Sequence, residues 1–242
     1  MTMKSAVIIS HLFMYDSICI GDIVIDATAG NGHDTVFMAE CVGKEGVVIA
    51  IDKQEGAIQS TKNLLLEHDI QHVNCMVADH SEMEIVLQPF IQRVSCICFN
   101  LGYLPGSSDR SIITNTQSTI KALDACLTLL QYRGAISVIA YRGHEHGLEE
   151  ALAVEDWMRK LPTHEWHVTR TEPINQSASA PIVYFAEKKA DYSLIRNCSV
   201  KRNNASFLSA DTFTEIRIPS SMSSLSTISP AAYILGKIFM AS

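Results

Sequence analysis

The sequence predicts an α/β fold in which helices cover both faces of a mostly parallel sheet that ends in an antiparallel hairpin. Short β-branched runs alternate with segments of helical period from Ile23 to Leu161, which is the pattern of parallel strands joined by helical crossovers. The stretch from 164 to 187 contains two strand-like runs with only a loop between them. With 242 residues, 47% of them apolar, the chain is long enough to bury such a core.

Seven strands and six helices follow one another along the chain. The predicted strands span residues 23–25, 47–51, 73–77, 94–99, 135–140, 167–171 and 182–185. Helices are expected at 6–14, 35–41, 57–67, 83–87, 113–130 and 148–161. In the longest helix one apolar stripe predicts a face packed against the core. It consists of Ile113, Ile120, Leu123, Leu127 and Leu130.

The charge balance excludes a protein that is drawn to polyanions by its overall field. Nineteen Lys and Arg stand against 26 Asp and Glu, so the net charge is −7, and a nucleic-acid substrate would be held by a local patch. The first 189 residues carry the acidic excess, whereas the remainder is Ser-rich and weakly basic. We therefore expect one domain over 1–189 and a C-terminal extension of unknown role over 190–242.

Cysteine usage and hydropathy predict a soluble, cytoplasmic protein. The seven cysteines are an odd number spread through apolar runs, which is typical of buried, reduced thiols. Cys96 and Cys98 have no further Cys or His at close spacing, so no metal site is predicted. No run reaches the roughly 18 to 20 apolar residues that span a bilayer, and we expect no membrane partner.

The strongest local motif, Asp-Ala-Thr-Ala-Gly-Asn-Gly-His-Asp-Thr (26–35), connects the first strand to the next helix. Its glycines let the backbone approach a ligand, and the helix start offers unpaired N–H groups. A dinucleotide site would have a third glycine in place of Thr35, and two aspartates would repel a pyrophosphate. Because carboxylates suit a sulfonium and an α-amino group, the loop favours S-adenosylmethionine over NAD, and a turn without ligand is the alternative. The loop residues assigned to the cofactor are Asp26, Gly30, Asn31, Gly32 and Asp34.

Polar residues also follow the next two strands. Asp52 closes the second strand and Gln54 starts the following helix, where a carboxylate accepts hydrogen bonds from ribose hydroxyls. Asp79 and His80 follow the third strand, where a carboxylate can accept from an adenine amino group. Each residue alone suits a solvated turn. Because α/β sheets bind ligands at the carboxyl ends of their strands, we assign all four to the cofactor site.

The fourth strand ends in a loop, Asn-Leu-Gly-Tyr-Leu-Pro-Gly (100–106). Asn100 and Tyr103 have the spacing of the Asn/Asp-Pro-Pro-Tyr loop of amino-methylating enzymes. An Asn carbonyl can hold the N–H groups of an amine and aim its lone pair, while a Tyr ring stacks on a base. We assign these two as catalytic, and Leu101 and Gly102 to the substrate. A turn Asn and a core Tyr are the alternative, and no proton acceptor is evident.

These motifs, together with Tyr-Arg-Gly-His (141–144) and the segment of Asn175 and Pro181, resemble the putative rRNA methylase family over residues 3–188. The resemblance implies a Rossmann-like class I methyltransferase, often dimeric. Characterised members methylate the aminomethyl group of the modified wobble uridine of tRNA. The chain departs from the family pattern at a substrate-facing rim, which bears on the substrate more than on the cofactor. The implied cofactor contacts are Asn31, Asp34, Asp52, Gln54, Asp79 and His80, and the departures are Ser107, Ser108, Arg142 and His146.

We expect RNA to be held by a few basic residues. Arg110 follows the catalytic loop and Arg142 ends the fifth strand, so both should contact phosphate in one cleft, with His144 beside them. Basic residues between 188 and 202 form the alternative surface. The sequence thus predicts a tRNA methyltransferase. An rRNA or small-molecule methyltransferase and an inactive cofactor-binding scaffold are the alternatives.

Overall fold

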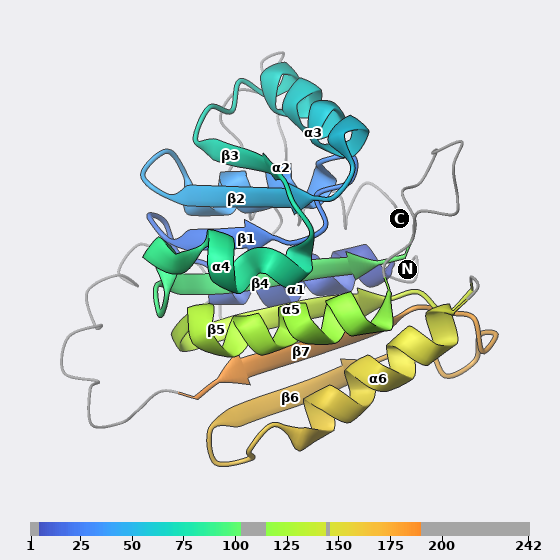
Figure 1. Cartoon of the computed structure of the whole chain (residues 1–242). Coiled ribbons are helices and arrows are strands. Elements are labelled where there is room, and N and C mark those ends of the chain that lie inside the picture. Colours follow the sequence, from blue (N-terminus) through green and yellow to red (C-terminus); the bar gives the residue numbers. More distant parts are fainter. Residues whose placement is uncertain (1–4, 103–114, 144–145, 190–242) are drawn as a thin grey trace, which may run out of the picture. The chain divides into compact units, whose positions relative to one another are not determined.

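The computed structural model describes residues 5–102, 115–143 and 146–189 (Figure 1). Within these ranges seven strands form one sheet in the order β3-β2-β1-β4-β5-β7-β6. Strands β1 to β5 pair in parallel, and β7 lies antiparallel between β5 and β6. The predicted α/β class and the C-terminal hairpin are therefore confirmed. The strands are β1 (Ile23–Asp26), β2 (Val47–Asp52), β3 (Val73–Val77), β4 (Val94–Leu101), β5 (Leu130–Ala140), β6 (Trp166–Thr171) and β7 (Ile182–Lys188).

Helices cover both faces of this sheet (Figure 1). From β1 through β2 to β3 the chain moves towards one edge of the sheet. Connections between parallel strands are right-handed, so the connecting helices α2 and α3 lie on the same face. Helix α1 contacts α2 on that face. After the direction reverses at β4, the later helices lie on the other face. The helices are α1 (Ala6–Ser17), α2 (His33–Val42), α3 (Glu55–Glu67), α4 (Met83–Val86), α5 (Thr116–Leu129) and α6 (Gly147–Lys160), with short turns η1 (His80–Glu82) and η2 (Gln88–Phe90).

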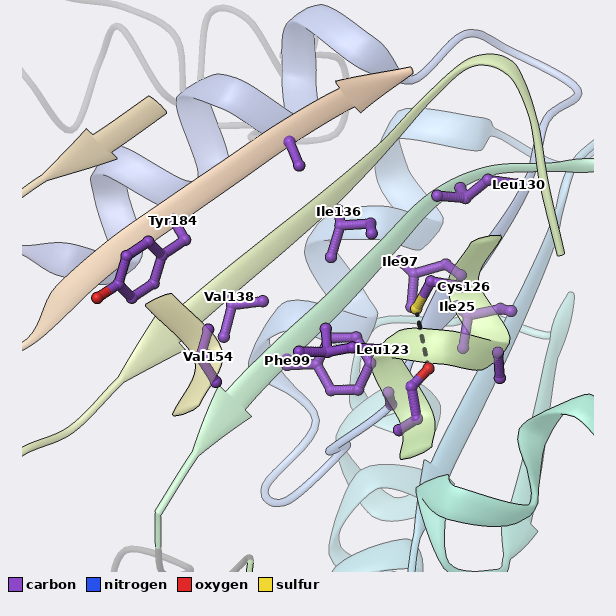
Figure 2. Close-up of a cluster of buried hydrophobic side chains, with 14 of the residues drawn as sticks. Ile25, Ile97, Phe99, Leu123, Cys126, Leu130, Ile136, Val138, Val154 and Tyr184 are labelled. Carbon is purple, nitrogen blue, oxygen red and sulfur yellow. Dashed lines mark hydrogen bonds between the residues drawn. The ribbon is translucent and has the colours of Figure 1, made fainter. Parts of the chain in front are cut away.

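The main core lies between the central strands and α5 (Figure 2). Ile97 and Phe99 of β4 point into it and are almost fully buried, as are Leu123 and Cys126 of α5. The Cys126 thiol donates a hydrogen bond to a carbonyl one turn earlier, at 3.2 Å. This packing holds β4 in the middle of the sheet, and Asn100 lies near the end of this strand.

The predicted long helix ends one residue before its expected last core position. Leu130 is buried as expected, but it begins β5 instead of ending the helix. Leu127 is 37% exposed, which contradicts its predicted place in the core. Successive helical residues are about 100° apart around the helix axis. Leu127 directly follows the buried Cys126, so its side chain points away from the buried face. The buried face consists of Thr119, Ala122, Leu123, Ala125, Cys126 and Leu129.

Helix α1 is firmly anchored to the sheet. The Ser10 hydroxyl shares a 2.7 Å hydrogen bond with the Ser137 hydroxyl of β5, and both side chains are buried. The Phe13 ring stacks on Phe185 of β7, with 4.8 Å between the centroids. These contacts leave little freedom to the residue between them, His11.

The cysteines within the described ranges are all free, and Cys41, Cys96, Cys98 and Cys126 are buried. Burial raises the pKa of Cys41 to about 12, so this thiol stays protonated. Among the described helices, none has the length and apolarity to cross a bilayer.

The strand order changes direction between β1 and β4, which are neighbours although two strands separate them in sequence. The backbone N–H of Ala27 donates to the carbonyl of Cys98 at 2.9 Å. The backbone N–H of Asn100 donates to the Thr28 hydroxyl at 2.7 Å. These bonds tie the loop after β1 to the end of β4. Open α/β sheets bind ligands at such a switch point.

Candidate active site

The loop after β1 adopts a conformation that requires glycine. Gly30 and Gly32 have φ values of 54° and 86°, in the left-handed region that glycine enters without strain. A Cβ at Gly32 would also come within 2.9 Å of the Thr61 Cα in α3. The Thr61 hydroxyl donates to the Gly30 carbonyl at 3.2 Å. The predicted close turn is therefore present, with the half-buried Asn31 between its two glycines.

Asp26 supports this loop from below. It is only 1% exposed, so the structure corrects its predicted place among residues that line the cofactor site. One carboxylate oxygen accepts from the Thr35 hydroxyl at 2.6 Å and the other accepts from the backbone N–H of Thr28 at 3.2 Å. Burial, and then the nearby Asp34 charge, raise the pKa of Asp26 to about 7.

This raised pKa predicts a pH-dependent stability. Between the ordinary pKa and about 7, the folded protein holds a proton that the unfolded chain has released, so stability falls as the pH rises. From about pH 6 to about pH 8 the free energy of unfolding should decrease by roughly 1 kcal/mol because of Asp26. Asp26→Asn should remove this contribution. Urea unfolding of both proteins across this range measures it, and parallel pH profiles would contradict the assignment.

Asp52 lies at the end of β2 and faces the glycine loop. One of its oxygens accepts from the backbone N–H of Gly30 at 3.0 Å, and the other accepts from the backbone N–H of Gln54 at 2.9 Å. Gln54 is the residue that precedes α3. Each carboxylate oxygen retains a second acceptor position. Asp52 is thus oriented by the backbone and still able to accept from ligand hydroxyls.

Asp79 and His80 follow β3, as predicted. Burial alone would raise the pKa of Asp79, but hydrogen bonds from Ser81 lower it below the ordinary value. His80 is buried edge-on against Phe99, with 6.0 Å between the ring centroids, and burial lowers its pKa. Within the described residues the buried His80 Nε2 has no hydrogen-bond partner. A buried polar atom of this kind fits a site that a ligand completes.

The Asn100 amide is held in one orientation at the end of β4. Its Nδ2 donates to Asp34 Oδ2, and because a carboxylate only accepts, the amide nitrogen must face Asp34. The buried Oδ1 finds no donor among the described residues. The next residue, Leu101, has a fully buried side chain, so any contact of Leu101 with a substrate falls to its backbone. Gly102 ends the described part of this loop.

Asp34 connects Asn100 to a residue that the sequence analysis did not assign, His11 of α1. His11 Nε2 lies 2.5 Å from Asp34 Oδ1, and the two side chains are 18% and 13% exposed. Burial, and then the Asp34 charge, raise the pKa of the hydroxyl of Tyr141, the residue after β5. The one signal for His11 in the sequence was a polar pair, Ser10 and His11, that interrupts the apolar run from Ala6 to Met14.

Arg142 differs from its prediction. Its Nε donates to the Ala180 carbonyl at 2.8 Å and its Nη2 pairs with Glu172 at 3.3 Å. The side chain is 14% exposed, because the loop between β6 and β7 folds against the end of β5. The structure thus corrects the expectation of a guanidinium free for phosphate. Three other predicted site residues, Tyr103, Arg110 and His144, lie outside the described ranges.

The site suits S-adenosylmethionine. An acidic residue ends β2, another follows β3, and the glycine loop follows β1. Among the described residues, buried polar atoms of His80 and Asn100 have no hydrogen-bond partner. Asp52 is placed to hold ribose hydroxyls, and the loop backbone to approach the remainder of the molecule. No cluster of three or more metal-ligating side chains occurs in the ranges that the structure describes.

The strand order and the acids along one edge of the sheet define a class I S-adenosylmethionine-dependent methyltransferase. The family model described as "Putative rRNA methylase" matches residues 48–187. The chain belongs to this family, and its cofactor is S-adenosylmethionine. A second model, for protein-L-isoaspartate(D-aspartate) O-methyltransferase, matches residues 2–83, a segment that contains the glycine loop.

Individual relatives agree with this assignment. A chloroplastic tRNA (mnm(5)s(2)U34)-methyltransferase from Arabidopsis thaliana is 39% identical over 196 residues, which cover 77% of this chain and 70% of the relative. A crystal structure named a putative rRNA-methylase from Clostridium thermocellum is 35% identical, with a TM-score of 0.72, and covers 78% of this chain and 100% of its own. A Streptococcus mutans methyltransferase in complex with SAH is 30% identical, with a TM-score of 0.67, covering 77% and 99%.

Proposed function

We propose that this protein methylates a primary amine on tRNA, namely the aminomethyl group of a modified uridine at the wobble position. The observation that carries the proposal is the buried carbonyl of Asn100, which the Asp34 contact holds in place and which has no partner among the residues that the structure describes. An amine N–H is the donor that such a carbonyl lacks. The name of the Arabidopsis relative, which specifies uridine 34 of tRNA, supports the same substrate.

Orientation is the main contribution of the protein in this mechanism. When bound, S-adenosylmethionine supplies a methyl group on a positively charged sulfur. Asn100 Oδ1 accepts one N–H of the substrate amine, so that the nitrogen lone pair is aimed at the methyl group. The acidic residues around the glycine loop create a negative potential that favours a cationic methyl donor over neutral competitors.

Contact with RNA rests on residues at the rim of the site. We propose that Tyr103 stacks on the target base and that Arg110 pairs with a phosphate, with His144 near them, since the acidic domain offers no general attraction to RNA. Arg142 would act through its hold on the loop of Glu172 and Ala180. A homodimer and a cytoplasmic location stay predictions from the sequence.

The proposed substrate is tested by methyl transfer from labelled cofactor to three acceptors. These are tRNA that carries the unmethylated aminomethyl uridine, the same tRNA without the aminomethyl group, and rRNA. We expect label only in the first, and nucleoside analysis should find one added methyl group on the aminomethyl nitrogen. If only rRNA is labelled, the protein is still a methyltransferase but its substrate is rRNA and not tRNA. Cofactor binding without transfer to any acceptor would indicate an inactive scaffold.

A further inference from the structure

We propose that His11 is a positioning residue for methyl transfer: acting through Asp34, it keeps the Asn100 carbonyl turned towards the substrate amine. The proposal rests on the function proposed above. It assigns a role to α1, a helix that lies before the cofactor loop in the chain. The sequence by its pattern predicts a helix at 6–14 and no role for it in the site.

The three side chains form a continuous chain of hydrogen bonds. His11 Nε2 and Asn100 Nδ2 reach opposite oxygens of the same Asp34 carboxylate. Because the carboxylate is acceptor-only, both neighbours must present N–H groups to it, which sets the His11 tautomer as well as the Asn100 orientation. Through these hydrogen bonds, the position of His11 in α1 fixes the orientation of the Asn100 side chain near the end of β4.

The hydrogen bond from His11 is needed to hold the Asp34 carboxylate in place. Asp34 lies close enough to the buried Asp26 to raise the pKa of that carboxyl group, and like charges at short range favour movement apart. An amide is nearly symmetric in shape, so Asn100 keeps its nitrogen and oxygen in place only while the acceptor facing it stays fixed. A carboxylate held by His11 on one side and Asn100 on the other has little freedom to rotate.

The position of His11 is itself well defined. Its ring stacks in parallel on Phe37 of α2, with 3.9 Å between centroids and 4° between planes. The anchors of α1 on the sheet, through Ser10 and Phe13, flank it. The imidazole is thus packed before any ligand arrives, as a positioning group should be.

Two substitutions separate the hydrogen bond from the packing. His11→Phe keeps a ring against Phe37 but lacks the N–H, whereas His11→Gln places an amide N–H near the position of Nε2. We expect His11→Phe to lower kcat by about 10- to 100-fold, since a small misplacement near the reaction costs this much. His11→Gln should restore most of the rate. Cofactor affinity, measured by calorimetry, should change less than kcat in both, because Asp52 and the glycine loop are untouched.

A double-mutant cycle tests whether His11 acts through Asn100. In a protein that already carries Asn100→Ala, the further change His11→Phe should cost almost nothing, because the group that His11 positions is gone. Equal losses in both backgrounds would overturn the proposal and leave His11 a packing residue. If His11→Phe fails to fold, His11→Leu replaces it in the same cycle.

A measurement on the protein without substrate makes this inference independent of the proposed function. The side-chain amide signal of Asn100 in a nitrogen-15 correlation spectrum can be identified by its loss in Asn100→Ala. We expect this signal to shift in His11→Phe and to return towards its parental position in His11→Gln. A signal unmoved by His11→Phe would overturn the inference. If the signal responds but tRNA is not methylated, only the proposed substrate fails.

Discussion

Asn100→Ala is expected to lower kcat for methyl transfer by about 100- to 1000-fold, a loss comparable to removal of one preorganised hydrogen-bonding group from an active site. The physical reason is that the buried Asn100 carbonyl, near the end of β4, has no partner within the described ranges, so the substrate amine loses the contact that orients its lone pair. Single-turnover transfer of labelled methyl to aminomethyl-bearing tRNA measures the effect.

The same variant should bind S-adenosylmethionine about as tightly as the parent, because Asp52 and the glycine loop are untouched. Asn63→Ala, on the exposed side of α3, is the matched control and should transfer methyl at the parental rate. If Asn100→Ala also keeps the parental rate, Asn100 is an ordinary turn residue and amine recognition must come from elsewhere.

Asp52→Ala should weaken S-adenosylmethionine binding by about 1.5 to 3 kcal/mol, the usual range for hydrogen bonds to a charged group. This is roughly a 10- to 150-fold rise in Kd. Two effects combine, since Asp52 is expected to accept from ribose hydroxyls and its oxygens also hold the backbone N–H groups of Gly30 and Gln54. Isothermal titration calorimetry of both proteins measures the change.

Glu67→Ala is the control for the loss of one acidic charge. Glu67 lies at the exposed end of α3, the helix that follows Asp52 in the chain. This variant should bind the cofactor like the parent. A parental Kd for Asp52→Ala would show that this carboxylate serves only the loop, and the ribose contact would have to be reassigned.

Local patterns in the sequence are enough to predict the fold class and the places of several polar residues at the carboxyl ends of the strands. Alternating strand and helix patterns are local, and they are confirmed for all seven strands within the described ranges. Asp52 and Asn100 could be placed at strand ends because parallel strands bring their carboxyl ends to one edge. The tight turn of the glycine loop could also be predicted, because the left-handed conformations at Gly30 and Gly32 are ones that glycine itself favours.

The tertiary structure alone decided which polar groups face one another. Asp26 and Asp34 look alike in the sequence, but one is buried beneath the loop and the other joins His11 to Asn100. The sequence predicted an Arg142 side chain available to phosphate, but in the structure the loop between β6 and β7 places Glu172 and Ala180 beside it. Contacts between His11, Asp34 and Asn100 span three distant segments. No local pattern encodes such contacts, because they depend on how the helices pack against the sheet.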